Sequence, residues 1–171
     1  RRIEAVGGEN YIDMVNTAWV SLDVIKQQTK SANPLEEVRR LQESLSETEK
    51  RALSLEKALL QKAVEYSLSE EKLQIIKIDP KLHFAPAREV IDDLRNRFPE
   101  KVFLFYQVKN EKLTLALGRG SGFELDLVAF MKQYFKAIGG GGGGRPEFIQ
   151  CGGSDPQGIQ AVIEGLKDIV K

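Results

Sequence analysis

The sequence predicts an α+β protein, in which a long antiparallel helical hairpin of coiled-coil type precedes a small α/β domain with helices packed on a sheet. Two observations carry this prediction. Apolar residues recur at intervals of three and four through residues 10–72, which is the period of an amphipathic helix. Residues 73–171 alternate short β-branched runs with amphipathic segments separated by proline or glycine, as in a sheet covered by helices.

Two helices are expected first, at residues 10–30 and 34–72, with Asn10 as a candidate cap and Pro34 in a first turn. The break Ser31-Ala32-Asn33-Pro34 at their junction favours an antiparallel hairpin. The second helix is the longer, so part of its apolar stripe stays uncovered, and two hypotheses remain: a hairpin that buries itself, or a dimerisation surface. The candidate seam residues are Val38, Leu41, Leu45, Leu55 and Leu59.

The second part should form a compact unit of alternating elements. Strands are expected at residues 73–78, 102–108 and 112–117, and helices at 86–98, 126–138 and from 155 onward. Residues 118–123 are rich in glycine, but Phe123 stands where a dinucleotide fingerprint needs a third glycine. We therefore expect a turn there, with Arg119 exposed.

Six consecutive glycines at 139–144, followed by Arg145 and Pro146, are the most informative feature of the chain. Fixing six glycines has a high cost in chain entropy, so a sequence that carries them needs unusual backbone freedom or close approach. Three interpretations follow: tight backbone packing, a backbone N–H concavity that binds phosphate together with Arg145, or a flexible linker.

Composition excludes several classes of protein. The chain has 171 residues, with 25 Lys+Arg and 25 Asp+Glu, and this zero net charge argues against a strongly basic nucleic-acid binder if the charge is evenly spread. Apolar residues make up 42%, too many for a disordered chain. A single cysteine and a single histidine cannot alone make a disulfide framework or a His/Cys zinc site. The missing initiator methionine suggests a segment of a longer protein.

Residues 139–153, Gly-Gly-Gly-Gly-Gly-Gly-Arg-Pro-Glu-Phe-Ile-Gln-Cys-Gly-Gly, resemble the glycine-rich signature of the C-terminal domain of alanyl-tRNA synthetases, which is related to the DHH-associated domain. Residues 1–6, Arg-Arg-Ile-Glu-Ala-Val, are similar to the last strand of the editing domain of those enzymes. The resemblance implies three regions: an editing-domain tail at 1–9, a helical hairpin and dimerisation subdomain at 10–72, and a glycine-rich globular subdomain at 73–171.

The resemblance implies a non-catalytic module that holds the outer corner of alanine-specific tRNA and couples aminoacylation with editing. It also implies a homodimer, a cytoplasmic location, and a parent ligase that uses ATP, Mg and Zn. No contact with membranes is expected, because no apolar run approaches the roughly 20 residues that span a bilayer. The editing histidine motif and the aminoacylation motifs are absent, so this chain alone should neither charge nor deacylate tRNA, and no cofactor, catalytic residue or metal ligand is expected in it.

The phosphates of tRNA would meet the basic side chains of the globular part and its glycine run. The candidates are Lys101, Lys109, Lys112, Arg119, Lys132, Lys136 and Arg145, with Gly139, Gly140, Gly141, Gly142, Gly143 and Gly144. Three alternatives remain: the C-terminal domain of a long-form free-standing alanyl-tRNA editing protein, a coiled-coil dimerisation scaffold, and the substrate-binding accessory domain of a DHH-type phosphoesterase.

Overall fold

A computed structural model describes residues 7–170; the editing-domain strand expected at residues 1–6 lies outside the described residues. The chain forms two compact units, residues 1–50 and 51–171. The boundary differs from the expected division at residue 72 because Leu60 and Val64, near the end of the second helix, are buried in the core of the second unit.

Helix α1 (Glu9–Thr29) and helix α2 (Pro34–Ser67) confirm the two predicted helices. The cap of α1 is Gly8, not the predicted Asn10, and α1 ends where Lys30 takes a left-handed conformation at φ 49°. Helix α2 stops at Ser67, five residues before the predicted end at Lys72.

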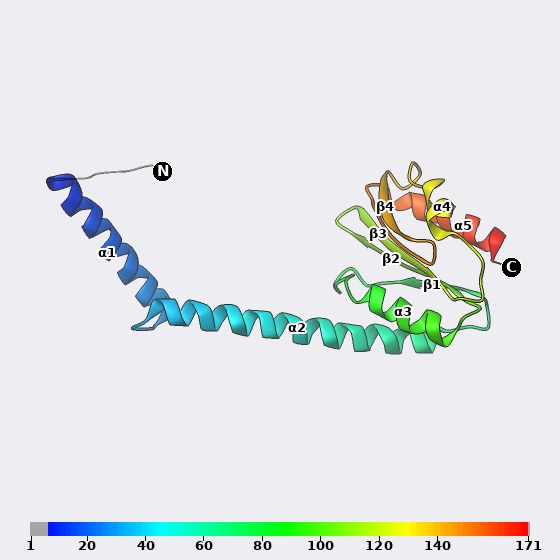
Figure 1. Ribbon diagram of the computed structural model, residues 1–171, viewed down its shortest axis with the longest axis horizontal. Coiled ribbons are helices and arrows are strands. Elements are labelled where there is room, and N and C mark those ends of the chain that lie inside the picture. The colour runs from blue at the N-terminus through cyan, green and yellow to red at the C-terminus, as the bar shows by residue number, and fades with distance from the viewer. Residues whose placement is uncertain (1–6, 171) are drawn as a thin grey trace. The chain divides into compact units, whose positions relative to one another are not determined.

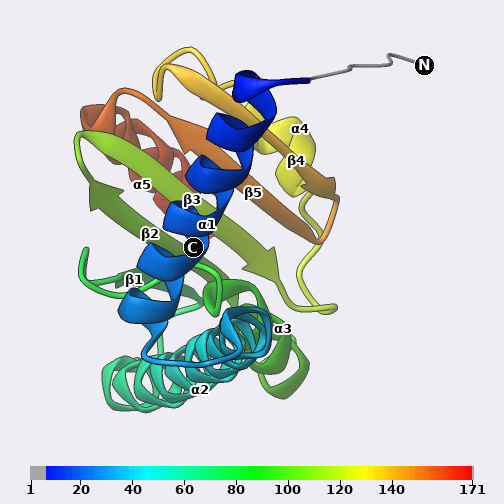
Figure 2. The same ribbon diagram turned by 90° about the vertical axis from the view of Figure 1, so that its left-hand side faces the viewer.

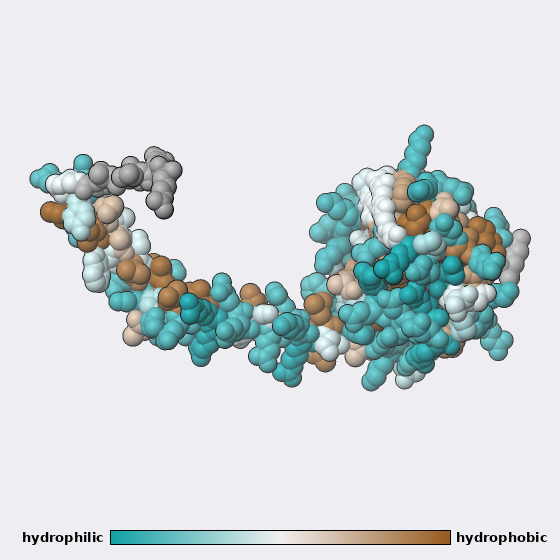
Figure 3. Space-filling model, viewed as in Figure 1, coloured by the Kyte–Doolittle hydropathy of each residue, from teal (hydrophilic) through white to brown (hydrophobic). Residues whose placement is uncertain are grey.

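The apolar stripes of these helices are exposed, which corrects the hypothesis of a hairpin that buries itself. Helix α1 contains no buried residue, and Trp19 is 64% exposed. The predicted seam of α2 is also open, with Leu41 and Leu45 at 53% and 60% exposure. Figure 3 shows apolar residues along α1 and the start of α2. Spacing identified the stripe, but spacing alone does not say what covers it.

The second unit is built on a five-stranded sheet with the order β1-β2-β3-β5-β4 (Figure 1). The strands are β1 (Leu73–Lys77), β2 (Val102–Lys109), β3 (Lys112–Arg119), β4 (Gly140–Arg145) and β5 (Phe148–Gly153). Strands β1 and β2 are parallel, and every other pair is antiparallel. The α+β class is confirmed, with two strands more than the sequence predicted.

Helices cover both faces of this sheet (Figures 1 and 2). Helix α3 (Ala87–Arg97) and the end of α2 pack on one face; α4 (Leu127–Lys132), a 3₁₀ turn (Pro156–Gly158) and α5 (Ile159–Ile169) pack on the other. Strand β2 lies between the two cores, because Phe103 and Phe105 face α3 while Leu104 faces the opposite layer. This two-sided burial explains why the β2 sequence is almost continuously apolar.

The helix predicted at residues 126–138 is shorter than expected. The Asp126 side chain caps it by accepting from the backbone N–H groups of Val128 and Ala129. The α-helix ends at Lys132, after which the backbone tightens, as the bond from the Tyr134 N–H to the Met131 carbonyl shows. The predicted deep packing is confirmed, since Leu127, Phe130 and Met131 are buried.

Five of the six glycines, Gly140 to Gly144, lie in strand β4, the outer strand of the sheet beside β5, and Gly139 precedes it with φ 60° (Figure 2). A Cβ atom at Gly140, Gly142 or Gly144 would lie 1.9, 2.2 or 2.1 Å from a backbone oxygen of β5, whereas nothing lies within 4 Å of one at Gly141 or Gly143. The close-packing interpretation is therefore confirmed for alternate glycines, and the flexible linker is wrong.

The alternation along β4 gives a matched pair of substitutions. Gly142→Ala places a methyl group against the Gln150 carbonyl and should lower the free energy of unfolding by about 1–3 kcal/mol. Gly141→Ala enters open space and should be neutral or raise it by up to about 1 kcal/mol. Denaturant titration of both variants measures this. Equal effects would contradict the packing of β4.

Candidate nucleic-acid interface

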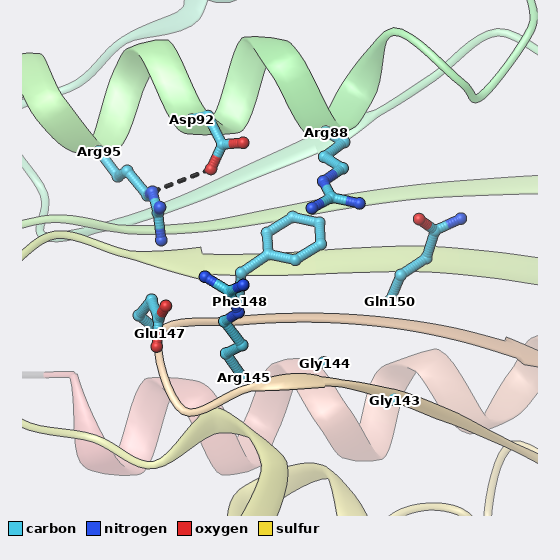
Figure 4. Close-up of a pocket in the computed structure, with 9 residues that line it drawn as sticks. All are labelled: Arg88, Asp92, Arg95, Gly143, Gly144, Arg145, Glu147, Phe148 and Gln150. Atoms are coloured by element: carbon cyan, nitrogen blue, oxygen red, sulfur yellow. Dashed lines mark ion pairs between the residues drawn. The ribbon is translucent and has the colours of Figure 1, made fainter.

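A groove of about 450 Å³ lies between α3 and the β4–β5 edge (Figure 4). Both walls belong to the second compact unit. We call this the arginine groove; its lining residues are Arg88, Asp92, Arg95, Gly143, Gly144, Arg145, Glu147, Phe148 and Gln150. A neighbouring hollow of about 430 Å³ shares Arg95 and Glu147 with it and adds Arg119.

Helix α3 contributes three of these side chains through one face. Arg88, Asp92 and Arg95 are spaced by four and three residues, so they line up along the helix while Val90, Ile91 and Leu94 face the core. A close approach of α3 to β3 supports this wall, because a Cβ at Gly118 would lie 2.1 Å from Cγ2 of Ile91. The glycine in β3 thus positions the arginines of α3.

The arginines differ in how their charges are engaged. The Nε atom of Arg95 lies 3.0 Å from Oδ1 of Asp92 in an ion pair. The Arg88 guanidinium lies over the Phe148 ring, 5.5 Å from its centroid. Among residues 7–170, neither Arg88 nor Arg145 makes an ion pair. Two guanidinium groups of the groove are therefore available to an anion, a role for which their planar fork is suited.

The glycine wall complements these cations. All six residues of β4 are exposed, and Gly143 and Gly144 line the groove without side chains. Figure 3 shows the glycines of β4 at the surface of the second unit. A phosphate group can therefore approach the backbone of this wall closely, with Arg145 at its end.

The structure separates the predicted phosphate contacts. Of these, Arg145, Gly143 and Gly144 line the arginine groove. Arg119 borders the neighbouring hollow, but it is half-buried and not exposed as expected, because its Nε donates to the Leu125 carbonyl at 2.6 Å. Lys101 is 8% exposed, and its ammonium donates to the backbone carbonyls of Ser69 and Glu71. The side chain therefore holds the segment that precedes β1 and is not available to a phosphate.

The remaining candidates lie away from the groove. Lys109 and Lys112 pair across the β2–β3 turn, at the opposite end of the strands from Arg119. Lys132 and Lys136 are exposed on the α4 segment, which packs on the sheet face opposite α3. These four lysines therefore do not join Arg145 in one site.

Sequence reasoning missed Arg88, Arg95, Phe148 and Gln150. The spacing of Arg88, Asp92 and Arg95 was a usable signal, since it marks the outer face of an amphipathic helix. The position of Phe148 beside this face could not be predicted from sequence, because strand β5 was not predicted and its pairing with β3 is a long-range contact.

No group of three or more His, Cys, Asp or Glu within residues 7–170 is placed to hold a metal ion. No described helix is both long and apolar enough to cross a membrane.

Residues 70–171 match the model of the DHHA1 domain family, and the chain belongs to that family. Its curated relatives include alanine–tRNA ligases. The one from Campylobacter jejuni strain 81-176 is 32% identical over all of this chain and 20% of its own length. The chain spans about a fifth of the length of the curated relatives it matches.

Two solved structures are similar in fold. The C-Ala domain of Aquifex aeolicus alanyl-tRNA synthetase aligns at 23% identity over 60% of this chain and 94% of that one, with a TM-score of 0.49. The exonuclease RecJ bound to manganese aligns at 18% identity over 78% of this chain and 32% of that one, with a TM-score of 0.52.

Cys151 is 3% exposed and lies in the core between the sheet and helices α4 and α5, on the face opposite α3. Burial raises the pKa of its thiol from 9.0 to about 11, so at pH 8 its thiolate fraction should be about a hundredfold below that of the unfolded chain. A thiol reagent should therefore label the folded protein slowly and the denatured protein quickly, with Cys151→Ala as the blank. Fast labelling of the folded protein would contradict this burial.

The same pKa shift has a consequence for stability. Folding raises the pKa of the Cys151 thiol, so the neutral thiol contributes to the free energy of unfolding. This contribution is complete below pH 9 and is lost as pH rises toward about 11, which lowers the free energy of unfolding by up to about 2–3 kcal/mol. Cys151→Ala should remove this part of the alkaline destabilisation in denaturant titrations at pH 8 and pH 11.

Proposed function

We propose that this chain is the C-terminal tRNA-binding segment of an alanine–tRNA ligase, without catalytic activity of its own. In this role it holds the outer corner of alanine-specific tRNA, which couples aminoacylation with editing in the longer protein. The arginine groove is the observation that carries the proposal, because it combines exposed guanidinium groups with the exposed backbone of Gly143 and Gly144. The alanine–tRNA ligase relatives, similar along the whole chain, support the assignment.

The charge of the groove suits a polyanion. Its lining, taken with the neighbouring hollow, contains four arginines and two carboxylates, and one of these carboxylates, Asp92, is already paired with Arg95. A phosphate chain that follows this groove would meet the guanidinium groups of Arg95 and Arg145. Such contacts fix the position of the RNA without reading its sequence.

ATP, Mg and Zn belong to the catalytic parts of the proposed parent ligase, and a cytoplasmic location goes with the same proposal. A free-standing alanyl-tRNA editing protein with the same C-terminal segment, or a DHH-type phosphoesterase, would place the segment in a different parent. The upstream sequence of the parent protein distinguishes these three proposals. An aminoacylation core would indicate the ligase, an Asp-His-His motif would indicate the phosphoesterase, and neither would be present in the free-standing editing protein.

Binding of tRNA should depend strongly on salt. If about four phosphates are neutralised, log affinity should fall with log salt at a slope of about −3 to −4. Arg145→Ala should weaken binding several-fold at low salt and reduce the slope by about 1. A filter-binding titration across salt measures both.

Lys109→Ala is the matched control, since it removes one exposed cation at the far end of the strands. Its slope should equal that of the unaltered chain. A flat salt response, or no binding below about 100 μM at low salt, would contradict the proposal.

The exposed stripe of α2 favours a second role, self-association. Val38, Leu41, Leu45, Leu55 and Leu59 are between 39% and 60% exposed along one side of the helix. An apolar row of this length is typical of a coiled-coil seam, and the seam residues of a second copy would cover it. We therefore propose a homodimer through α2 alongside tRNA binding.

Substitution of two seam residues tests the dimer. Each buried leucine contributes about 1.5–3 kcal/mol, so Leu41→Lys with Leu45→Lys in both copies should raise the dimer dissociation constant more than about a hundredfold. Gln42→Lys with Ser44→Lys adds the same charge at exposed polar positions and should leave the dimer intact. Sedimentation of the whole chain gives the answer; a monomer at high concentration before any substitution would reject the idea.

A further inference from the structure

We infer that Arg88 and Phe148 form a stacking site for one unstacked nucleobase of the bound tRNA, whose phosphate Arg145 holds. The inference rests on the proposed function and adds to it a residue pair and a kind of contact. Phe148 is the first residue of β5 and is half-buried, with part of its ring packed on the core beside Ile91. Figure 4 shows the ring between Arg88 of α3 and Arg145 of β4.

The acidic neighbours of Arg88 are engaged by other cations. Oε2 of Glu89 lies 2.7 Å from Nζ of Lys57, and Asp92 pairs with Arg95. The Lys57 contact lowers the pKa of Glu89, so this carboxylate stays charged and committed to the lysine. Arg88 is exposed and has the ring as its contact, which leaves its charge uncompensated at the mouth of the groove.

The shape of the groove favours a single base over a paired helix. A volume of about 450 Å³ lies at the lower end of the range of about 300–1,000 Å³ that small-ligand sites occupy. A base that has left its stack can enter such a recess and lie against an aromatic ring or a guanidinium plane. A continuous duplex would touch the arginines through its phosphates and leave Phe148 without a role.

Two further residues complete the site. Gly143 has an open side, because nothing lies within 4 Å of the position that a Cβ atom would take there, and this leaves space for the base next to the strand. Gln150 is exposed on the same lining, and its amide can donate to and accept from the edge of a base. The groove therefore offers a stacking face, an edge partner and a phosphate partner within one surface.

Stacking and phosphate contacts have different salt signatures, and the experiment uses this difference. Binding of tRNA is measured at several salt concentrations for the unaltered whole chain and for three variants, Phe148→Leu, Arg88→Lys and Arg88→Ala. Lys109→Ala is the control variant. Loss of a stacked base should weaken binding about 5- to 150-fold at every salt concentration, with an unchanged slope. Arg88→Lys should behave like Arg88→Ala, because an ammonium keeps the charge and loses the planar surface.

Each outcome has a defined meaning. Phe148→Leu keeps an apolar side chain on the core, and a thermal unfolding transition close to that of the unaltered chain shows that it folds; Arg88→Lys tests the same site at an exposed position. Binding by Phe148→Leu or Arg88→Lys within twofold of the unaltered chain would overturn the inference and leave the proposed function standing. If the slope of log affinity against log salt falls by about 1 in Arg88→Ala while Arg88→Lys keeps full affinity, Arg88 contacts a phosphate. This result would also overturn the stacking inference. No tRNA binding by the unaltered chain would reject the proposed function itself.

Discussion

The second unit depends on the pairing of β4, which is glycine at every position except Arg145, with β5. Because Gly140, Gly142 and Gly144 have no Cβ atoms, their backbone approaches β5 more closely than any other residue type would allow. This pairing completes the sheet beside β3 and holds Phe148 and Arg145 opposite each other at the end of the hairpin. The same glycine run also exposes the backbone of Gly143 and Gly144 to the arginine groove.

The opposite wall depends on the core beneath α3. Val90, Ile91 and Leu94 are almost fully buried against Phe103 and Phe105, so the helix has little freedom to rotate. Its outer face must then present Arg88, Asp92 and Arg95 toward β4 and β5. Burial of one face of α3 thus determines which way the charged side chains on its other face point, and this holds them along the arginine groove.

Much of this fold could be predicted from local patterns. Periodicity gave the two long helices, strands β1 to β3 and helix α3, because each of these elements repeats its burial along the chain. Strands β4 and β5 could not be predicted in this way, since a glycine run has no hydropathy pattern and the extended state of Gly140 to Gly144 depends on pairing with β5. For the same reason Arg145 was predicted as an anion ligand, while Arg88 and Phe148, which meet it only through the sheet, were not.

The zero net charge of the chain is compatible with a polyanionic partner because the charge is unevenly spread. Residues 1–72 carry 11 basic and 13 acidic side chains, and residues 73–171 carry 14 and 12. Within the second part, four arginines meet only two carboxylates around the groove and its neighbouring hollow. A small total charge gives little long-range attraction, so a phosphate is attracted mainly within the screening length, about 8–10 Å, of these guanidinium groups. In the proposed role, contact of this kind would position an RNA that other parts of the ligase already hold, since tethering raises its effective concentration at the groove.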